Sequence, residues 1–194
     1  MRYYRKIAGE KVYLSPMNAD DAEQYTEWLN RRDVTDNVGN TDLMMTLEGE
    51  RAWISQERDQ YQFAIVEQSS NRLLGNCGIQ NINWRRRCAE IGLFLGEEES
   101  RGKGYGREVL ELLQEYAFDV LNLHSLSLRV YSFNTRAIKC YEKAGFSHCG
   151  RLREAYYING MYHDMLFMDI LKGSALITGT TYTLERDPVY KAKR

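Results

Sequence analysis

Helix-type and strand-type patterns of apolar residues alternate along this chain, and its first third is predicted to be mostly helical. Residues 12–14 form a short apolar run typical of a strand. A helix is predicted from about Asn18, because four apolar residues then recur at the spacing of one helical face: Ala22, Tyr25, Trp28 and Leu29. A second helix is predicted after Thr46, where a capping hydroxyl precedes Glu48 and Glu50 in the electropositive first turn.

The middle of the chain changes to a strand pattern. Residues 63–66 and 73–82 are predicted strands joined by a turn-rich segment at 69–71, and a third strand is predicted at 88–95. After a glycine-rich turn, one helical face collects seven apolar residues: Val109, Leu112, Leu113, Tyr116, Ala117, Val120 and Leu121. Residues 126, 128 and 130 then alternate as a strand. This strand–helix–strand order predicts parallel strands joined by a right-handed crossover.

The last part of the pattern predicts a helix followed by an antiparallel hairpin. Asn134 is placed to cap a helix over about 135–144, and Gly145 is placed to end it. Residues 152–158 and 161–170 flank Asn159-Gly160, a strong signal for a two-residue hairpin turn. The elements together predict a mixed α/β (α+β) fold. Its central mixed sheet would carry the strand–helix–strand unit and the C-terminal hairpin.

Residues 1–173 are predicted to form one domain, because the chain has only two prolines and no Gly/Ser-rich linker divides it. Residues 174–194 are interpreted as either a tail or an added edge strand. Within them, the alternation over 177–184 is the kind that an edge strand shows, and an unprotected edge is usually paired or covered. A homodimer or larger assembly is therefore expected.

Charge and apolar runs exclude several classes of partner. The chain has 26 basic and 27 acidic side chains and a net charge of -1, so no overall field attracts it to nucleic acid or to an anionic membrane. No apolar run approaches the ~20 residues of a membrane span. The first residues also lack the apolar stretch of a signal peptide. A cytoplasmic location is expected.

Neither the cysteines nor the histidines predict a metal site. Four scattered cysteines without C-x-x-C spacing indicate buried small apolar residues rather than disulfides or zinc ligands: Cys77, Cys88, Cys140 and Cys149. The three histidines lie far apart in the sequence, and a lone histidine such as His163 is more often a packing residue than a site residue. The basic run at 85–87 is interpreted as a turn between strands, with a small-anion site as the alternative.

The segment Arg101-Gly102-Lys103-Gly104-Tyr105-Gly106 is the main candidate for chemistry. Glycines let successive backbone N–H groups converge, and a following helix N-terminus adds partial positive charge, so a phosphate or pyrophosphate is the natural ligand. The alternative is a tight strand-to-helix turn that needs glycine only for its backbone angles. The glycine spacing fits neither the Walker loop nor the dinucleotide fingerprint.

This segment resembles the R/Q-x-x-G-x-G/A signature of the GNAT superfamily of N-acetyltransferases, with matches at Arg101, Gly104 and Gly106. Residues 134–146 resemble a second motif of the same family, N-x-x-A-x-x-x-Y-x-x-x-G-F. The resemblance covers about residues 11–171. Within the family the chain looks most like the bacterial group of ribosomal-protein alanine and spermidine N-acetyltransferases, because it shares three short segments with them: Ala89-Glu90, Asn122-Leu123 and Tyr157-Ile158-Asn159-Gly160.

The resemblance implies transfer of an acetyl group from acetyl-CoA, with no metal, to a primary amine of a small molecule such as a polyamine or of a protein N-terminus. Transfer would be direct, in a ternary complex. The motif places Tyr141 to give a proton to the CoA sulfur, and Glu90, on the strand entering the loop, is the best candidate base. The coenzyme would contact ten residues: Leu93, Phe94, Leu95, Arg101, Gly102, Lys103, Gly104, Tyr105, Gly106 and Asn134.

Several alternatives stay open at this stage. Tyr141 can be a packing residue, Glu90 can lie on a solvated face, and Asn134 can act only as a helix cap. The alternative function is a non-catalytic acyl-CoA sensor or an interaction module on the same fold. A sensor would keep the loop but lose the proton donor, so the presence of Tyr141 argues against it, and nothing in the sequence specifically favours an interaction module. Cys140 has no motif-linked histidine, which disfavours an acyl-cysteine route. Residues 20–60 and the hairpin are expected to wall the acceptor side, where four acids could either attract a cationic amine or be merely solvated: Asp33, Asp36, Asp42 and Glu50.

Overall fold

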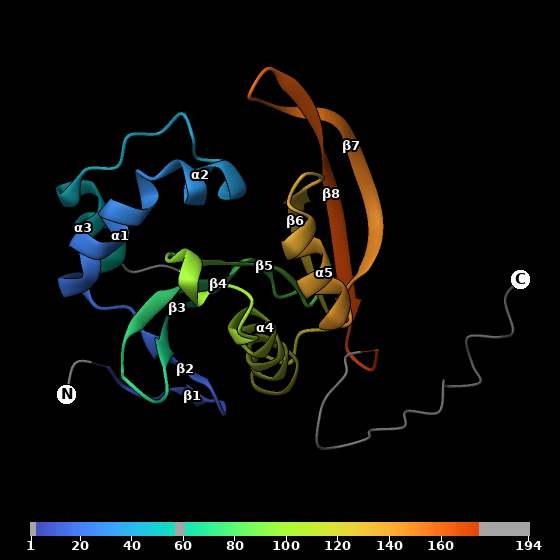
Figure 1. Ribbon diagram of the computed structural model, residues 1–194. Helices are drawn as coiled ribbons and strands as arrows, with labels where there is room; N and C mark the ends of the chain where they lie inside the picture. The colour runs from blue at the N-terminus through green and yellow to red at the C-terminus, as the bar shows by residue number, and fades with distance from the viewer. Residues whose placement is uncertain (1–2, 57–60, 175–194) are drawn as a thin grey trace, which may run out of the picture.

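The computed structural model describes residues 3–56 and 61–174 and contains one mixed sheet with helices on either side of its centre (Figure 1). The strands are β1 Ile7–Ala8, β2 Val12–Pro16, β3 Tyr61–Glu67, β4 Leu73–Asn83, β5 Cys88–Leu95, β6 Ser125–Tyr131, β7 Ser147–Ile158 and β8 Met161–Leu171. The α-helices are α1 Ala22–Leu29, α2 Arg32–Val38, α3 Leu47–Ser55, α4 Tyr105–Glu115 and α5 Thr135–Lys143. Short 3-10 turns precede α1 and α4, and a π-turn follows α4: Ala19–Asp21, Glu98–Ser100 and Tyr116–Val120.

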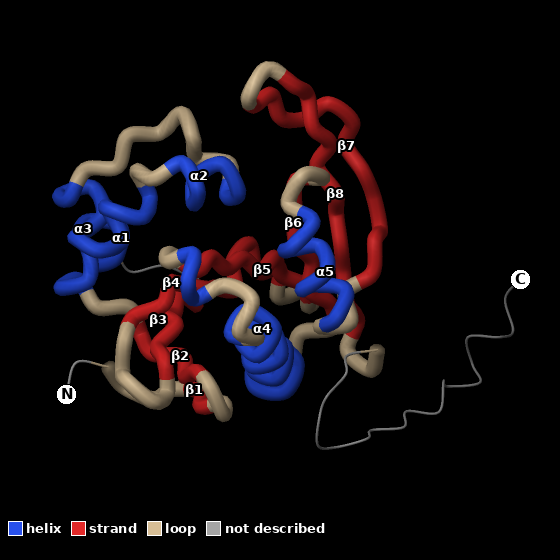
Figure 2. Tube along the Cα trace, in the orientation of Figure 1, coloured by secondary structure: helices blue, strands red, loops and turns tan. Residues whose placement is uncertain are grey.

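The strands of the described part lie in the order β1-β2-β3-β4-β5-β6-β8-β7. β5 and β6 run parallel, and α4 connects them, as the strand–helix–strand pattern predicts. All other neighbours in this sheet are antiparallel. The predicted mixed sheet is therefore confirmed. Figure 2 shows that α1, α2 and α3 gather on one side of the molecule, while the long β7–β8 hairpin stands on the other.

Side-chain caps and apolar faces explain where the helices lie. The Asn18 side chain accepts from the Asp20 amide just before α1, the Thr46 hydroxyl accepts from Gly49 at the start of α3, and Asn134 accepts from Ala137 at the start of α5. These starts agree with the predicted ones. The predicted face of α1 is buried, with Tyr25 and Trp28 at the contact. Because the apolar face of α4 packs on the sheet, the strand–helix–strand unit forms one core with the strands.

Two features of the helices differ from the sequence prediction. α2 carries no apolar stripe, so periodicity does not reveal it, and only Val34 and Thr35 of the helix are buried. The predicted apolar stripe from 109 to 121 is confirmed except at Val120, since Tyr116, Ala117 and Leu121 beyond α4 also pack in the core. The π-turn after α4 rotates the following side chains out of the 3.6-residue register, and Val120 is 64% exposed.

The hairpin turn is confirmed and its first strand is longer than predicted. Asn159 and Gly160 both have left-handed backbone angles, with φ of 52° and 80°, which is the geometry of a type I′ turn. β7 begins at Ser147 rather than Leu152, and its register with β8 shifts at two bulges. Because β7 is an edge strand with most side chains exposed, it lacks the apolar alternation that would mark its start.

The prediction that the cysteines are buried holds only for Cys77. Cys88 and Cys140 are half-buried and Cys149 is exposed, because the edge strand β7 leaves that side chain uncovered. The basic run at 85–87 lies in the turn between β4 and β5, as interpreted, and the Arg87 guanidinium donates to the Asn122 carbonyl.

None of the helices within residues 3–56 and 61–174 is long and apolar enough to cross a membrane. The same residues contain no group of three or more His, Cys, Asp or Glu side chains that could hold a metal ion. The predicted edge strand over 177–184 lies outside the described residues, and the assembly expected from it stays a prediction.

Candidate active site

The site forms where two parallel strands diverge. β5 pairs with β6 only through Cys88, Ala89 and Glu90, although both strands continue well beyond these residues. On its other side β5 is fully paired, since Leu93, Phe94 and Leu95 oppose residues of β4. On the β6 side the Leu95 carbonyl accepts from Arg101, and the remaining backbone groups of residues 93–95 are left for a ligand that can pair like an added strand.

Two cavities meet at this divergence and share part of their lining. The loop-side cavity, of about 460 Å³, is bounded by β5, the 101–106 segment and α5. The helix-side cavity, of about 540 Å³, is bounded by α2, α3, β4 and β5. Seven residues line both: Asn37, Val38, Leu93, Phe94, Arg129, Val130 and Tyr141.

The 101–106 segment presents its glycines to the loop-side cavity. Gly102 and Gly104 have φ of 77° and 89°, which a residue with a side chain adopts only at a cost, and Gly104 is the N-cap of α4. Gly102, Gly104 and Gly106 line the cavity, whereas Lys103 and Tyr105 do not. Instead, the Lys103 carbonyl accepts from Lys11 Nζ at 3.2 Å, and the Tyr105 hydroxyl donates to Glu67.

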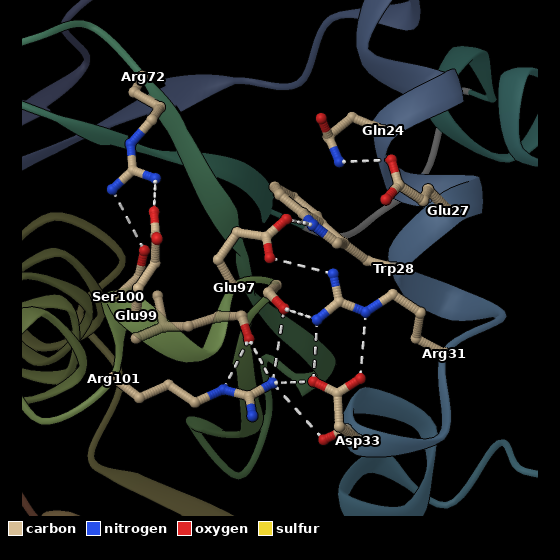
Figure 3. A network of polar contacts seen from close by, with 12 residues as sticks. Gln24, Glu27, Trp28, Arg31, Asp33, Arg72, Glu97, Glu99, Ser100 and Arg101 are labelled. Carbon is tan, nitrogen blue, oxygen red and sulfur yellow. Dashed lines mark hydrogen bonds and ion pairs between the residues drawn. The ribbon is translucent and has the colours of Figure 1, made fainter.

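The Arg101 side chain joins the loop to α2 through Asp33 (Figure 3). Its Nη2 donates to the Leu95 carbonyl at 3.2 Å and to Asp33 Oδ2 at 3.2 Å. Asp33, in the first turn of α2, also forms a two-bond ion pair with Arg31 at 3.0 and 3.1 Å. Arg31 in turn donates to Glu97, which also accepts from the Trp28 indole at 2.7 Å.

The hydrogen bonds of this network lower the pKa of two carboxyl groups, those of Asp33 and Glu97. The hydrogen bond from Arg31 lowers the pKa of Asp33, and the indole hydrogen bond from Trp28, followed by Arg31, lowers the pKa of Glu97. Both carboxylates are therefore ionised at neutral pH. Their contribution to stability is present above the ordinary carboxyl pKa and is lost as the pH falls through the lowered value.

We expect Asp33→Asn to raise the KM for acetyl-CoA, the donor that the sequence resemblance implies, by about two- to fivefold, the size of a partly exposed ion pair, because Arg101 and the loop lose their link to α2. The variant keeps the shape of the side chain. Asp36→Asn is the matched control, since Asp36 lies on the same helix and pairs with Arg32 instead. Steady-state kinetics and thermal unfolding of both variants test this, and equal KM values for the two would contradict it.

Tyr141 stands at the junction of the two cavities. Its ring packs against Phe146 with centroids 6.2 Å apart, and no described residue hydrogen-bonds its hydroxyl. Burial raises the pKa of Tyr141 well above its ordinary value of 10, so the hydroxyl stays protonated. The side chain can therefore donate a hydrogen bond to a group that enters either cavity.

Glu90 lines the helix-side cavity, and its side chain is 31% exposed. Its Oε2 accepts from Arg129 at 3.1 Å and from Asn81 at 3.2 Å. Asn134 lines the loop-side cavity and caps α5 as well. His163 packs edge-on against Phe133, with ring centroids 4.9 Å apart, and lines neither cavity, which agrees with the packing interpretation.

The family of this chain follows from its similarity to known proteins. The profile of the acetyltransferase (GNAT) domain matches residues 11–147. The chain belongs to the GNAT family. A probable N-acetyltransferase, YjcK, from Bacillus subtilis is 33% identical to it over 85% of this chain and 96% of its own length.

Two further similarities concern a GNAT relative from Vibrio cholerae. Its spermidine N(1)-acetyltransferase is 36% identical over 58% of this chain, and the match spans 64% of the Vibrio protein. A crystal structure of spermidine N-acetyltransferase from Vibrio cholerae, in complex with CoA and spermine, is similar with a TM-score of 0.78 and 25% identity. That similarity covers 86% of this chain and 98% of the other.

The helix-side cavity of this GNAT chain contains residues that the sequence motifs did not indicate. α2 and the segment after it supply Asn37, Val38, Gly39 and Asn40 to its lining. Gly39 lies against Tyr131, so an added Cβ would stand 2.4 Å from the tyrosine hydroxyl. A cap-like glycine after the polar segment 32–38 is the one local signal that could have indicated α2.

Of the four acids considered for the acceptor side, only Glu50 lines the helix-side cavity. It is buried in α3, which corrects the view that it is merely solvated. Asp33 lines the loop-side cavity instead, within the arginine network. Asp36 pairs with Arg32 at 3.6 Å. Asp42 lines neither cavity.

Proposed function

We propose that this protein transfers an acetyl group from acetyl-CoA to a primary amine of a polyamine such as spermidine. The observation that carries the proposal is the position of Tyr141 on the shared wall of two cavities, one glycine-lined and basic and the other containing Glu50 and Glu90. The names of the Vibrio cholerae relatives support this acceptor class.

The loop-side cavity suits the coenzyme. The backbone groups of residues 93–95 that β4 leaves unpaired would bond to the pantetheine amides, which are spaced like a short strand, and the Leu95 carbonyl would do so beside its hydrogen bond from Arg101. Amides of the 101–106 segment and the N-terminus of α4 would hold the pyrophosphate. Asn134 would bond near the pantetheine arm while it keeps its cap, because a side-chain amide has both donors and an acceptor.

Chemistry would take place at Tyr141. The amine nitrogen attacks the thioester carbonyl carbon, the C–N bond forms, and the C–S bond breaks as the sulfur takes up negative charge. The Tyr141 hydroxyl stabilises that charge by a hydrogen bond and passes its proton to the sulfur, so CoA leaves as the thiol; the proton that the new amide nitrogen releases restores the phenol. Since the raised pKa keeps the phenol neutral, donation needs no prior protonation step.

The attacking amine must first lose a proton. An alkylamine with pKa near 10.4 is about three units above neutral pH, so freeing its lone pair costs roughly 4 kcal/mol. Glu90 in the helix-side cavity is the proposed acceptor of this proton, directly or through water. A protein α-amine near pKa 8 costs only roughly 1 kcal/mol and depends less on such a base.

A covalent route through Cys140 is disfavoured by the environment of its sulfur. Burial is the main cause that raises the pKa of Cys140, so the thiol stays protonated and is a weak nucleophile. Direct transfer between the two bound substrates is therefore proposed. It requires the acceptor amine to enter from the helix-side cavity and meet the thioester beside Tyr141.

A panel assay tests this function. Thiol release from acetyl-CoA is measured with spermidine, spermine, aminoglycosides, amino sugars and peptides with free N-termini. We expect kcat/KM for the polyamines to exceed that for the peptides by at least tenfold, about 1.4 kcal/mol, because the helix-side cavity carries two carboxylates for a polycation. A higher kcat/KM for peptides would favour a protein N-terminus as acceptor. Binding of CoA without turnover on any amine would favour the non-catalytic sensor.

A further inference from the structure

The loop-side cavity has an excess of cations that the proposed pyrophosphate contacts do not use. Its lining contains six basic residues and one acid, Asp33. Three of the basic residues have carboxylate partners: Arg101 pairs with Asp33, Arg107 with Glu111 and Arg129 with Glu90. Within the described residues, the side chains of the other three are engaged in no ion pair or hydrogen bond: Arg136, Lys139 and Lys143.

These three unpaired cations come from one helix. Arg136, Lys139 and Lys143 follow each other at intervals of three and four residues in α5, so they lie along one side of it. The first turn of α5 contains no acid that could balance them. Like charges at this spacing repel by a few tenths of a kcal/mol per pair in the free protein, and a bound anion would relieve the repulsion within this stripe of three cations.

The stripe lies next to the glycine segment. An added Cβ at Gly106 would stand 3.5 Å from Cys140 Sγ, which places the middle of α5 against the start of α4. Lys143 and Arg107 both act electrostatically on the Cys140 thiol, so these two cations are close to the same point. An anion bound to these three side chains would therefore lie close enough to a pyrophosphate on the 101–106 loop for one ligand to contact both.

We propose that Arg136, Lys139 and Lys143 form the binding site for the 3′-phosphate of the coenzyme. This inference rests on the proposed function, which supplies the ligand. Coenzyme A carries a pyrophosphate and, on its ribose, a separate phosphomonoester with a charge near -2 at neutral pH. The backbone amides of the loop account for the pyrophosphate, and the three side chains of α5 supply charge-assisted donors for the second group.

The test compares two ligands on three proteins by calorimetry at low salt. The ligands are CoA and dephospho-CoA, which lacks only the 3′-phosphate. The proteins are the wild type, the triple variant Arg136→Gln/Lys139→Gln/Lys143→Gln, and the control Arg85→Gln/Arg86→Gln/Arg153→Gln. The control removes the same three charges from residues that line neither cavity. Thermal unfolding confirms that each protein is folded.

We expect the wild type and the control to bind CoA at least tenfold more tightly than dephospho-CoA, with a preference that shrinks as salt is raised. The α5 variant should lose most of this preference through weaker CoA binding, while its affinity for dephospho-CoA stays within about threefold. A preference that survives in the α5 variant would overturn the site, as would an equal loss in the control. CoA binding without any preference in the wild type would overturn it but leave the proposed function standing. Failure of both ligands to bind the folded wild type would overturn both.

Discussion

Tyr141→Phe is expected to lower kcat by about 10²- to 10⁴-fold, the usual range for a positioned proton donor. The substitution keeps the ring that packs on Phe146 and removes only the hydroxyl at the junction of the two cavities. Because the hydroxyl would act as charge develops on sulfur, the affinity for CoA should stay nearly unchanged. Steady-state kinetics with the best amine and calorimetry with CoA measure the two effects.

A control variant and the pH profile test whether the loss of kcat comes from the Tyr141 hydroxyl itself. Tyr162→Phe removes the same group from an exposed tyrosine of β8 outside both cavities and should leave kcat unchanged. Since burial raises the pKa of Tyr141 above 10, the loss from Tyr141→Phe should be the same at every pH below about 10. A kcat within threefold of the wild type would mean that Tyr141 is only a packing residue and that another group supplies the proton.

Glu90→Gln serves as the companion variant for the base. If Glu90 takes the proton of the amine, this change should lower kcat/KM more for an alkylamine than for a peptide α-amine, because the alkylamine is harder to deprotonate. It should also remove the rising part of the pH profile that Tyr141→Phe keeps. Equal effects on both acceptors would assign deprotonation to water.

Gly106→Leu is expected to weaken CoA binding at least tenfold, about 1.4 kcal/mol, while the protein becomes no less stable. Gly106 lies in the first turn of α4, where any side chain favours the helix by up to about 1 kcal/mol over glycine. Gly106 lines the loop-side cavity, so a leucine side chain would enter the space proposed for the pyrophosphate. Affinity and stability should therefore change in opposite directions.

Gly106→Ala is the matched control for this prediction. A Cβ at position 106 stands 3.5 Å from Cys140 Sγ and 3.9 Å from Leu93 Cδ1, which is ordinary contact. The alanine variant should gain helix stability and keep CoA affinity within about threefold. Calorimetry and thermal unfolding measure both quantities. Unchanged affinity in a folded Gly106→Leu protein would show that the pyrophosphate lies elsewhere.

Local patterns of the sequence were sufficient for the fold class and for the positions of most candidate residues. Glycine at 102 and 104 is required by left-handed backbone angles, Asn134 caps a helix through its own side chain, and Asn159-Gly160 makes a type I′ turn. Each of these depends on a few neighbouring residues, so each can be predicted from the residues themselves. The parallel β5–β6 pair followed in the same way from the order of a strand, a helix and a strand.

Only the tertiary structure decided how these parts form a site. The ion pair between Asp33 and Arg101 joins residues 68 positions apart. The sequence of α2 has no periodic apolar face, with only Val34 and Thr35 buried, so its position depends on contacts with distant residues such as Arg101. The early divergence of β5 from β6 creates two cavities with Tyr141 between them, and burial there moves its pKa upward. Such properties depend on which distant groups surround a residue and exclude water from it, and spacing along the chain carries no information about either.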